Sequence, residues 1–336
     1  MEPLLKLDHY SVSFQTSMGE VQAVRDVNLT LNKGEVLAVV GESGCGKTVM
    51  CQSIMKLLPK TARIKSGTVS VNGTDITNYK EKKMRNLRGP VLSMVFQDPM
   101  TTLNPTIPVG KQIEEAILRH EKVSREEARK RAIEMMDLVG ITQPEYRYSL
   151  QPHYFSGGMR QRCVLAIALA TSPELLFADE PTTALDVTVQ AKILDLLLEI
   201  RDKTNIGILF ISHDLGVVAR IADRVAVMYA GKIVEIGTAE EIFYHPCHPY
   251  TWGLLSAHPA LAADGGKLHS IQGMPPVMLN PPPGDAFAER NPYAMKIDYE
   301  KEPPMFQVSD THWAATWLLD ERAPKVEPPI SLKRVE

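Results

Sequence analysis

The residues from Gly41 to Thr48 have the types and spacing needed to hold a chain of phosphates. Their sequence, Gly-Glu-Ser-Gly-Cys-Gly-Lys-Thr, matches the pattern G-x-x-x-x-G-K-[ST]. Glycines in such a loop let backbone N–H groups turn inward around phosphate oxygens at the start of a helix. Lys47 then reaches the β- and γ-phosphates, and the Thr48 hydroxyl binds Mg²⁺. The nucleotide-binding residues expected here are Gly41, Ser43, Gly44, Cys45, Gly46, Lys47 and Thr48.

The surroundings of this loop favour a nucleotide site over a plain glycine-rich turn. A continuous apolar run ends at Val40, and residues 49–58 have a helical pattern. A phosphate loop needs this order, a buried strand before it and a helix after it.

A pair of acidic residues follows the apolar run 175–178. Asp179 ends that run and Glu180 comes directly after it. Carboxylates are good Mg²⁺ ligands, so we expect Asp179 on the metal side. Adjacent side chains at the end of a strand point in different directions, which leaves Glu180 to face the attacking water as a general base. A solvated acidic pair is the alternative, and the phosphate loop upstream argues against it.

The elements that must position these groups follow from the hydrophobic pattern. Apolar and polar side chains alternate over the first forty residues, which predicts half-buried antiparallel strands. Short apolar runs, typical of strands buried on both faces, then alternate with amphipathic helices such as 187–204. These runs are 36–40, 91–96, 175–178, 208–211 and 225–229. The order predicts an α/β fold with a mainly parallel core sheet and an antiparallel N-terminal sheet.

The pattern changes twice along the chain. Strand-like runs stop at Asp98, and helical patterns such as 124–139 replace them, so we expect an inserted helical subdomain at about 98–158. Eleven of the 24 prolines fall between residues 274 and 336, together with Trp313 and Trp317. Prolines favour irregular structure, but the tryptophans argue against disorder. We therefore expect an ATPase domain over 1–260 and a packed, proline-rich extension over 261–336.

A third motif indicates the class of ATPase. The segment Phe155-Ser156-Gly157-Gly158-Met159 resembles L-S-G-G-Q, the signature of ABC-type ATPases, with Phe and Met at its two ends. The resemblance implies the P-loop NTPase fold of an ABC nucleotide-binding domain. It also implies that Ser156, Gly157 and Gly158 hold the γ-phosphate of ATP bound to a second subunit.

Other segments resemble the remaining motifs of the ABC family, in the same order. Residues 95–99 resemble the Q-loop, 184–186 the D-loop and 212–214 the switch-histidine loop. The resemblance implies that Gln97 lies near Mg²⁺ and the attacking water, that His213 acts in hydrolysis and that Asp186 contributes to the site. Phe14 lies where the family has an aromatic that stacks on adenine, although a strand core residue is an equal alternative.

The last part of the chain resembles a narrower branch, the peptide (oligopeptide, dipeptide and nickel) importers. The segment 248–255 carries the likeness, and residues 284–292 and 310–313 are most similar to D-type ATPase subunits of oligopeptide permeases. Many members hold an iron–sulfur cluster on four cysteines in this tail. The aligned positions here are Asp285, Asn291, Asp298 and Thr316. Clusters need thiolates, so we expect ATP and Mg²⁺ but no iron–sulfur cluster.

Composition limits the partners. Lys and Arg number 37 against 40 Asp and Glu, so no global positive field exists to hold nucleic acid. The longest apolar run, 163–170, is far shorter than the ~20 residues that span a bilayer, and the first residues lack a secretory pattern. We therefore expect a protein made and kept in the cytoplasm, and the resemblance implies that it lies there as a peripheral protein at the cytoplasmic face of the cell membrane. The resemblance implies a related ABC ATPase as heterodimer partner, two transmembrane permease subunits and, indirectly, an extracellular solute-binding protein.

The leading hypothesis is an ATPase that powers import of oligopeptides or dipeptides. Alternatives are an importer of nickel or another solute, a soluble ABC ATPase that acts on DNA or ribosomes, and an inactive binding subunit. The short spacing between Lys47 and Ser156 and the single motif set argue against the soluble ATPase, and intact catalytic residues argue against the inactive subunit. The segment 245–249, His-Pro-Cys-His-Pro, could hold a metal, but its prolines favour a structural role.

Overall fold

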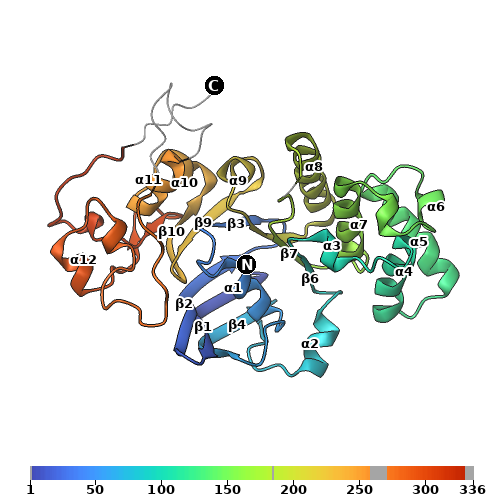
Figure 1. The fold of residues 1–336 in the computed structure, drawn as a ribbon, viewed down its shortest axis with the longest axis horizontal. Coiled ribbons are helices and arrows are strands. Elements are labelled where there is room, and N and C mark those ends of the chain that lie inside the picture. The colour runs from blue at the N-terminus through green and yellow to red at the C-terminus, as the bar shows by residue number, and fades with distance from the viewer. Residues whose placement is uncertain (1, 184, 258–270, 330–336) are drawn as a thin grey trace. The chain divides into compact units, whose positions relative to one another are not determined.

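The computed structural model describes residues 2–183, 185–257 and 271–329 (Figure 1). The chain divides into two compact units. The first, which we call the loop unit, comprises residues 1–30, 36–77 and 212–336, and the second, the signature unit, comprises 31–35 and 78–211. The phosphate loop belongs to the loop unit, and the acidic pair and the signature segment belong to the signature unit.

The loop unit contains an antiparallel sheet in the order β2-β1-β4-β5. Its strands are β1 (Leu5–Thr16), β2 (Gly19–Leu31), β4 (Ala62–Val71) and β5 (Thr74–Asp75). Strand β1 pairs with β4, with Leu5 opposite Val71 and Phe14 opposite Ala62. The alternation in the first forty residues therefore predicted β1 and β2 correctly, because buried and more exposed side chains alternate along these strands, whereas β4 and β5 lie beyond that segment and were not predicted.

A second set of strands in the loop unit has the order β11-β12-β10-β9-β3. The strands are β3 (Val36–Val40), β9 (Arg224–Tyr229), β10 (Lys232–Thr238), β11 (Phe306–Gln307) and β12 (Trp313–Ala314). β3 and β9 are parallel, and every residue of β3 is buried. The helices of this unit are α1 (Lys47–Ile54), α9 (Leu215–Ile221), α10 (Ala239–Tyr244), α11 (Pro249–Ser256) and α12 (Lys296–Glu300), with 3₁₀ turns η2 (Ala288–Arg290) and η3 (Trp317–Leu319).

The helix after the phosphate loop is shorter than the 49–58 expected. It begins at Lys47 and ends at Ile54. Lys56 has φ of 52°, a left-handed conformation that cannot continue a right-handed helix. The apolar side chains that continue the helical pattern beyond Ile54 therefore belong to a turn.

The signature unit contains the parallel strands β8-β7-β6. These are β6 (Leu92–Val95), β7 (Leu175–Asp179) and β8 (Gly207–Ile211), with Val95 opposite Ala178 and Asp179 opposite Ile211. The helices are α2 (Glu81–Leu87), α3 (Pro99–Thr102), α4 (Val109–His120), α5 (Arg125–Leu138), α6 (Pro144–Arg147), α7 (Gly157–Leu169) and α8 (Val187–Thr204), with the 3₁₀ turn η1 (Pro152–Tyr154). Helices α4, α5, α6 and α7 pack together as a group (Figure 1). None of the described helices is long and apolar enough to cross a membrane.

The C-terminal extension packs within the loop unit. Strand β12 pairs with β10, with Ala314 opposite Glu235, so the extension adds strands to this sheet (Figure 1). Trp313 and Trp317 are half-buried, and the Trp317 indole N–H donates to the Lys301 carbonyl oxygen at 2.9 Å. The tryptophans therefore take part in packing, as their presence in a proline-rich tail predicted.

Candidate nucleotide site

Glycines allow the tight path of the phosphate loop. Gly41, Gly44 and Gly46 have φ of 150°, 81° and 110°, which L-residues with side chains rarely adopt. A Cβ at Gly41 would lie 2.1 Å from the carbonyl oxygen of Met228, and one at Gly46 would lie 2.3 Å from that of Ala23. Even alanine at either position would force the loop away from the strands that support it.

Lys47 begins α1 and turns its side chain back into the loop. Its Nζ donates to the carbonyl oxygens of Gly41 at 2.7 Å and Glu42 at 2.9 Å, and lies 3.5 Å from Cys45 Sγ. Burial raises the pKa of the Cys45 thiol, and the neighbouring Lys47 charge offsets this only in part. The structure therefore brings the lysine ammonium to the centre of the loop, beside exposed Ser43 and Gly44 and half-buried Thr48.

His213 lies in the loop unit, in a turn just before the capped N-terminus of α9. The Asp214 backbone N–H donates to Ser212 Oγ at 3.0 Å, and Asp214 Oδ1 caps α9 by accepting from the N–H groups of Gly216 and Val217. These bonds fix the backbone on both sides of His213, whose side chain is exposed.

The acidic pair occupies the end of β7 in the signature unit. Asp179 is 3% exposed. Glu180 has φ of 46°, a left-handed backbone conformation. For a residue other than glycine this conformation costs on the order of 1 kcal/mol, and such strained residues are often found in active sites. Its N–H donates to the Ile211 carbonyl oxygen at 3.0 Å, so the strained position is held by β8.

The Glu180 carboxylate is oriented by two donors. Its Oε2 accepts from Gln97 Nε2 at 2.9 Å and from Thr183 Oγ1 at 3.0 Å. The structure therefore brings together two predicted site residues that lie 83 positions apart in the sequence. Thr183 was not predicted as a site residue, although the two threonines that follow Pro181 lie close enough to Glu180 in the sequence to have been considered.

The signature segment forms the start of α7. Ser156 Oγ accepts from the Met159 N–H at 3.4 Å, which caps the helix. A Cβ at Gly158 would lie 2.5 Å from Val189 Cγ1, whereas one at Gly157 would meet nothing closer than 4.0 Å. A side chain at Gly158 would therefore press on Val189 of α8, and exposed Ser156 and Gly157 leave the first turn of α7 accessible.

The structure does not test the roles expected for Asp186 and Phe14 in nucleotide binding. Asp186 Oδ1 accepts from the Val189 N–H at 2.9 Å and caps α8. Phe14 is half-buried near the end of β1. Both assignments therefore remain predictions, and Ala184 of the expected D-loop lies outside the described residues.

Comparison with known proteins identifies the family. Residues 24–183 match the family "ABC transporter", and residues 234–297 match "Oligopeptide/dipeptide transporter, C-terminal region". The chain is 59% identical to the oligopeptide transport ATP-binding protein OppD of Bacillus subtilis, over 98% of this chain and 93% of that protein. It belongs to the ATP-binding proteins of ABC peptide transporters.

Further relatives and solved structures agree. The dipeptide transport ATP-binding protein DppD of Lactococcus lactis is 54% identical over 97% of this chain and 94% of its own length. The dimeric bacterial ABC transporter cassette MJ0796 has a TM-score of 0.63 at 26% identity, covering 70% of this chain and 98% of that one. The ABC-type P-loop fold expected from the sequence is confirmed, as is the resemblance to peptide importers.

The four positions aligned with cluster cysteines hold local turns in this family member. Each side-chain oxygen accepts from a backbone N–H two or three residues away: Asp285 from Phe287 at 2.9 Å, Asn291 from Tyr293 at 3.0 Å, Asp298 from Met295 at 2.6 Å and Thr316 from Leu318 at 3.3 Å. Burial, reinforced by the charges of Asp298 and Glu302, raises the pKa of Asp285 to about 6. Oxygen acceptors therefore organise the turns of the extension.

The segment 245–249, weighed above as a metal site or a structural turn, is tied to the buried Glu235. That carboxylate accepts from the backbone N–H groups of Cys247 at 2.6 Å and His248 at 3.2 Å, and its Oε1 lies 2.8 Å from His312 Nε2. Glu235, Cys247 and His312 could each offer a ligand atom within 4.8 Å of the others. Burial and nearby carboxylates raise the pKa of the Cys247 thiol to about 12, which disfavours the thiolate a metal needs. The existing hydrogen bonds favour the structural interpretation.

Proposed function

We propose that this chain is the ATP-hydrolysing subunit that powers import of oligopeptides or dipeptides through a membrane ABC transporter. The observation that carries this proposal is its likeness, over nearly its whole length, to peptide transport ATP-binding proteins. The Glu180 carboxylate, held by Gln97 and Thr183, supports an active ATPase over an inactive binding subunit.

Each group then has a defined part in hydrolysis. Backbone N–H groups of the phosphate loop and Lys47 bind the phosphates, Glu180 and His213 act on the attacking water, and Phe14 stacks on adenine. Thr48, Gln97 and Asp179 are oxygen donors of the kind Mg²⁺ requires. A Mg²⁺ ion held by these residues would neutralise charge on the transferred phosphate. Ser156, Gly157, Gly158 and Asp186 act at the interface with a second ATPase subunit.

In this proposal, the chain forms a heterodimer with a second, related ABC ATPase. The heterodimer binds two transmembrane permease subunits, and an extracellular solute-binding protein delivers the peptide to them. The accessible first turn of α7 supports a signature that serves the partner's ATP, and the similar cassette MJ0796 is described as dimeric. In this arrangement the ATPase domain 1–260 lies at the cytoplasmic face of the membrane. Its helical insert at about 98–158 docks on the permease subunits. The C-terminal extension comprises residues 261–336.

We expect Ser156→Ala to slow hydrolysis at the partner's ATP site more than at this chain's own site. The serine hydroxyl and the first turn of α7 stabilise the γ-phosphate held by the partner. In assembled transporter carrying Glu180→Gln in this chain, residual ATP turnover reports the partner's site, and adding Ser156→Ala should lower it about tenfold.

The reciprocal complex is the control. When the general base of the partner subunit is replaced instead, turnover reports this chain's site, and Ser156→Ala should change it less than about twofold. Equal losses in the two complexes would rule out the shared site.

We also infer that the extension carries no iron–sulfur cluster. Carboxylate, amide and hydroxyl groups stand at the four aligned positions, and each already accepts a backbone hydrogen bond. Protein purified anaerobically should lack stoichiometric iron and acid-labile sulfide and show no absorbance from a cluster. A brown protein with bound iron and sulfide would contradict this inference.

A further inference from the structure

Glu42, the second residue of the phosphate loop, is held by three different side chains. Its backbone N–H donates to the Tyr250 hydroxyl at 2.8 Å, and its carbonyl oxygen accepts from Lys47 Nζ at 2.9 Å. Its carboxylate is bound by Arg290 through two parallel bonds, Nη1 to Oε2 at 2.6 Å and Nη2 to Oε1 at 2.9 Å. The same residue thus connects the extension, α11 and the phosphate-binding lysine.

Arg290 is itself fixed before it reaches the loop. Its side chain is 5% exposed, its Nε donates to the Gln272 carbonyl oxygen at 2.9 Å, and its Nη1 also donates to the Tyr229 hydroxyl at 3.2 Å. The Phe287 ring packs edge-on against Tyr229 and Tyr250, with ring centres 5.2 and 5.3 Å away. A guanidinium that is already fixed by these hydrogen bonds loses little conformational entropy when it binds a carboxylate.

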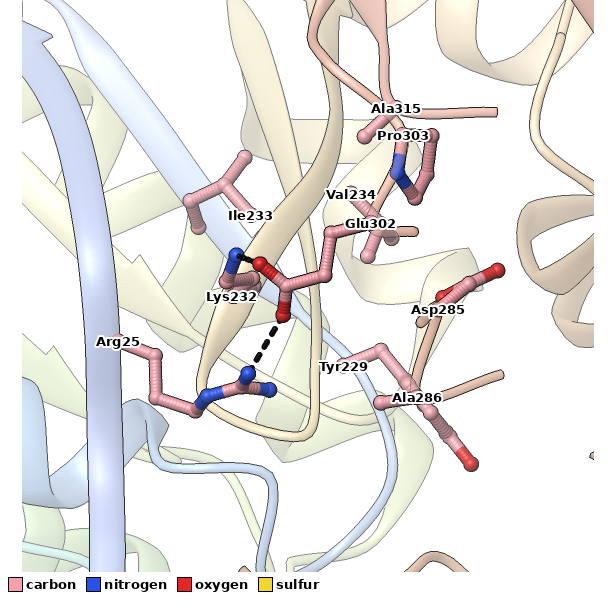
Figure 2. A pocket seen from close by; sticks show the side chains of 10 residues that line it. All are labelled: Arg25, Tyr229, Lys232, Ile233, Val234, Asp285, Ala286, Glu302, Pro303 and Ala315. Atoms are coloured by element: carbon pink, nitrogen blue, oxygen red, sulfur yellow. Dashed lines mark hydrogen bonds and ion pairs between the residues drawn. The ribbon is translucent and has the colours of Figure 1, made fainter. Parts of the chain in front are cut away.

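The extension is also anchored where it does not touch the loop. Figure 2 shows Glu302 between Arg25 of β2 and Lys232 of β10, with one carboxylate oxygen bound to each. On α10, Glu241 accepts from Ser309 Oγ at 2.5 Å and from Thr311 Oγ1 at 2.9 Å. These contacts hold the extension in place, so its fold does not depend on Arg290 alone.

We propose that Arg290 is a positioning residue for nucleotide binding, which neutralises Glu42 and holds it in the phosphate loop. This inference rests on the proposed ATPase function. It gives the C-terminal extension a direct part in nucleotide affinity, through a residue that does not belong to the nucleotide motifs.

The physical reason is the charge of Glu42. This carboxylate stands in a loop that must take up phosphates, and two negative groups at short range in a partly desolvated site repel each other strongly. Arg290 cancels that charge, and its planar fork matches both carboxylate oxygens, which a lysine cannot do. Without it, the free carboxylate would repel the phosphates and compete for Lys47.

The test measures the dissociation constant of Mg·ADP for the full-length protein by titration calorimetry. Arg290→Ala should raise this constant about tenfold, and Arg290→Lys should raise it less. Glu42→Gln should change it less than about threefold, because the amide is neutral. The double variant Arg290→Ala/Glu42→Gln should resemble Glu42→Gln, since without the carboxylate no charge remains to be neutralised.

Thr311→Ala is the matched control, because it removes a contact of the same extension with α10 without touching the loop. It should leave the constant unchanged. In the assembled transporter, Arg290→Ala should raise the KM for ATP and change kcat less than about twofold. A merely structural role would instead lower kcat and make the double variant at least as weak as Arg290→Ala.

The outcomes separate this inference from the proposed function. Failure of the unmodified protein to bind nucleotide would overturn the ATPase itself. Normal binding by that protein and equal binding by Arg290→Ala would overturn only the role of Arg290. If Arg290→Ala did not fold, the comparison of the double variant with Glu42→Gln would still test the charge, and much weaker Mg·ADP binding by the double variant would overturn the proposal.

Discussion

Replacement of Glu180 by glutamine is expected to reduce ATP hydrolysis at this chain's own site by at least about a hundredfold while ATP still binds there. A glutamine side chain keeps an oxygen that can accept from Gln97 and Thr183, so the geometry at the end of β7 should persist. An amide cannot take a proton from water, so only the chemical step is lost. The measurements are steady-state phosphate release and the affinity for Mg·ATP, together with peptide uptake by proteoliposomes that contain the assembled transporter.

Glu174→Gln is a suitable control for that experiment. Glu174 lies directly before β7 and forms an exposed ion pair with Lys33 at 2.6 Å, so it shares the element but not the site. Exposed ion pairs contribute about 1 kcal/mol or less, so this variant should hydrolyse ATP normally. Normal turnover by the Glu180→Gln protein would remove Glu180 from the role of general base.

Lys47→Ala is expected to abolish ATP turnover by a different route, through loss of binding. The Lys47 ammonium is buried at the centre of the loop, where its two carbonyl partners can be exchanged for phosphate oxygens. Hydrogen bonds to charged groups contribute about 1.5–3 kcal/mol each, so loss of two should weaken Mg·ATP binding about a hundredfold or more. Titration calorimetry with Mg·ATP would measure this directly.

The comparison of the two variants separates binding from chemistry. Glu180→Gln should bind ATP and not hydrolyse it, whereas Lys47→Ala should do neither at ordinary ATP concentrations. Lys56→Ala provides a control of the same type, because Lys56 follows α1 and donates to the Thr77 carbonyl oxygen away from the phosphate loop. Tight Mg·ATP binding by Lys47→Ala would contradict the position assigned to this lysine.

Local pattern was sufficient for two elements next to the nucleotide motifs, although it misplaced the bounds of α1. The run 36–40 and the helix 187–204 were predicted with the bounds that the structure gives β3 and α8. Fully buried strands need continuous apolar runs, and amphipathic helices need the 3.6-residue period. Both patterns can be recognised within a short stretch of sequence. The phosphate loop was likewise evident, because glycine spacing alone permits its conformation.

Contacts between distant parts of the chain were not predictable in this way. Strand β12 has two residues, too few to show any period, and it is recognised as a strand only by its pairing with β10 and β11. The contact of Thr183 with Glu180 is local, three positions apart, but which of the two neighbouring threonines turns its hydroxyl to the carboxylate depends on the conformation of the turn.

The sequence by itself determined the class of fold, the motifs and their chemistry, because these depend on residue types within a few positions of one another. Only the tertiary structure decided that Gln97 meets Glu180 and that Arg290 of the extension binds Glu42 of the phosphate loop, across 248 positions. Such pairings depend on the path of the whole chain through its sheets and turns. Periodicity describes which face of an element is buried, but it does not say which distant residue lies against that face.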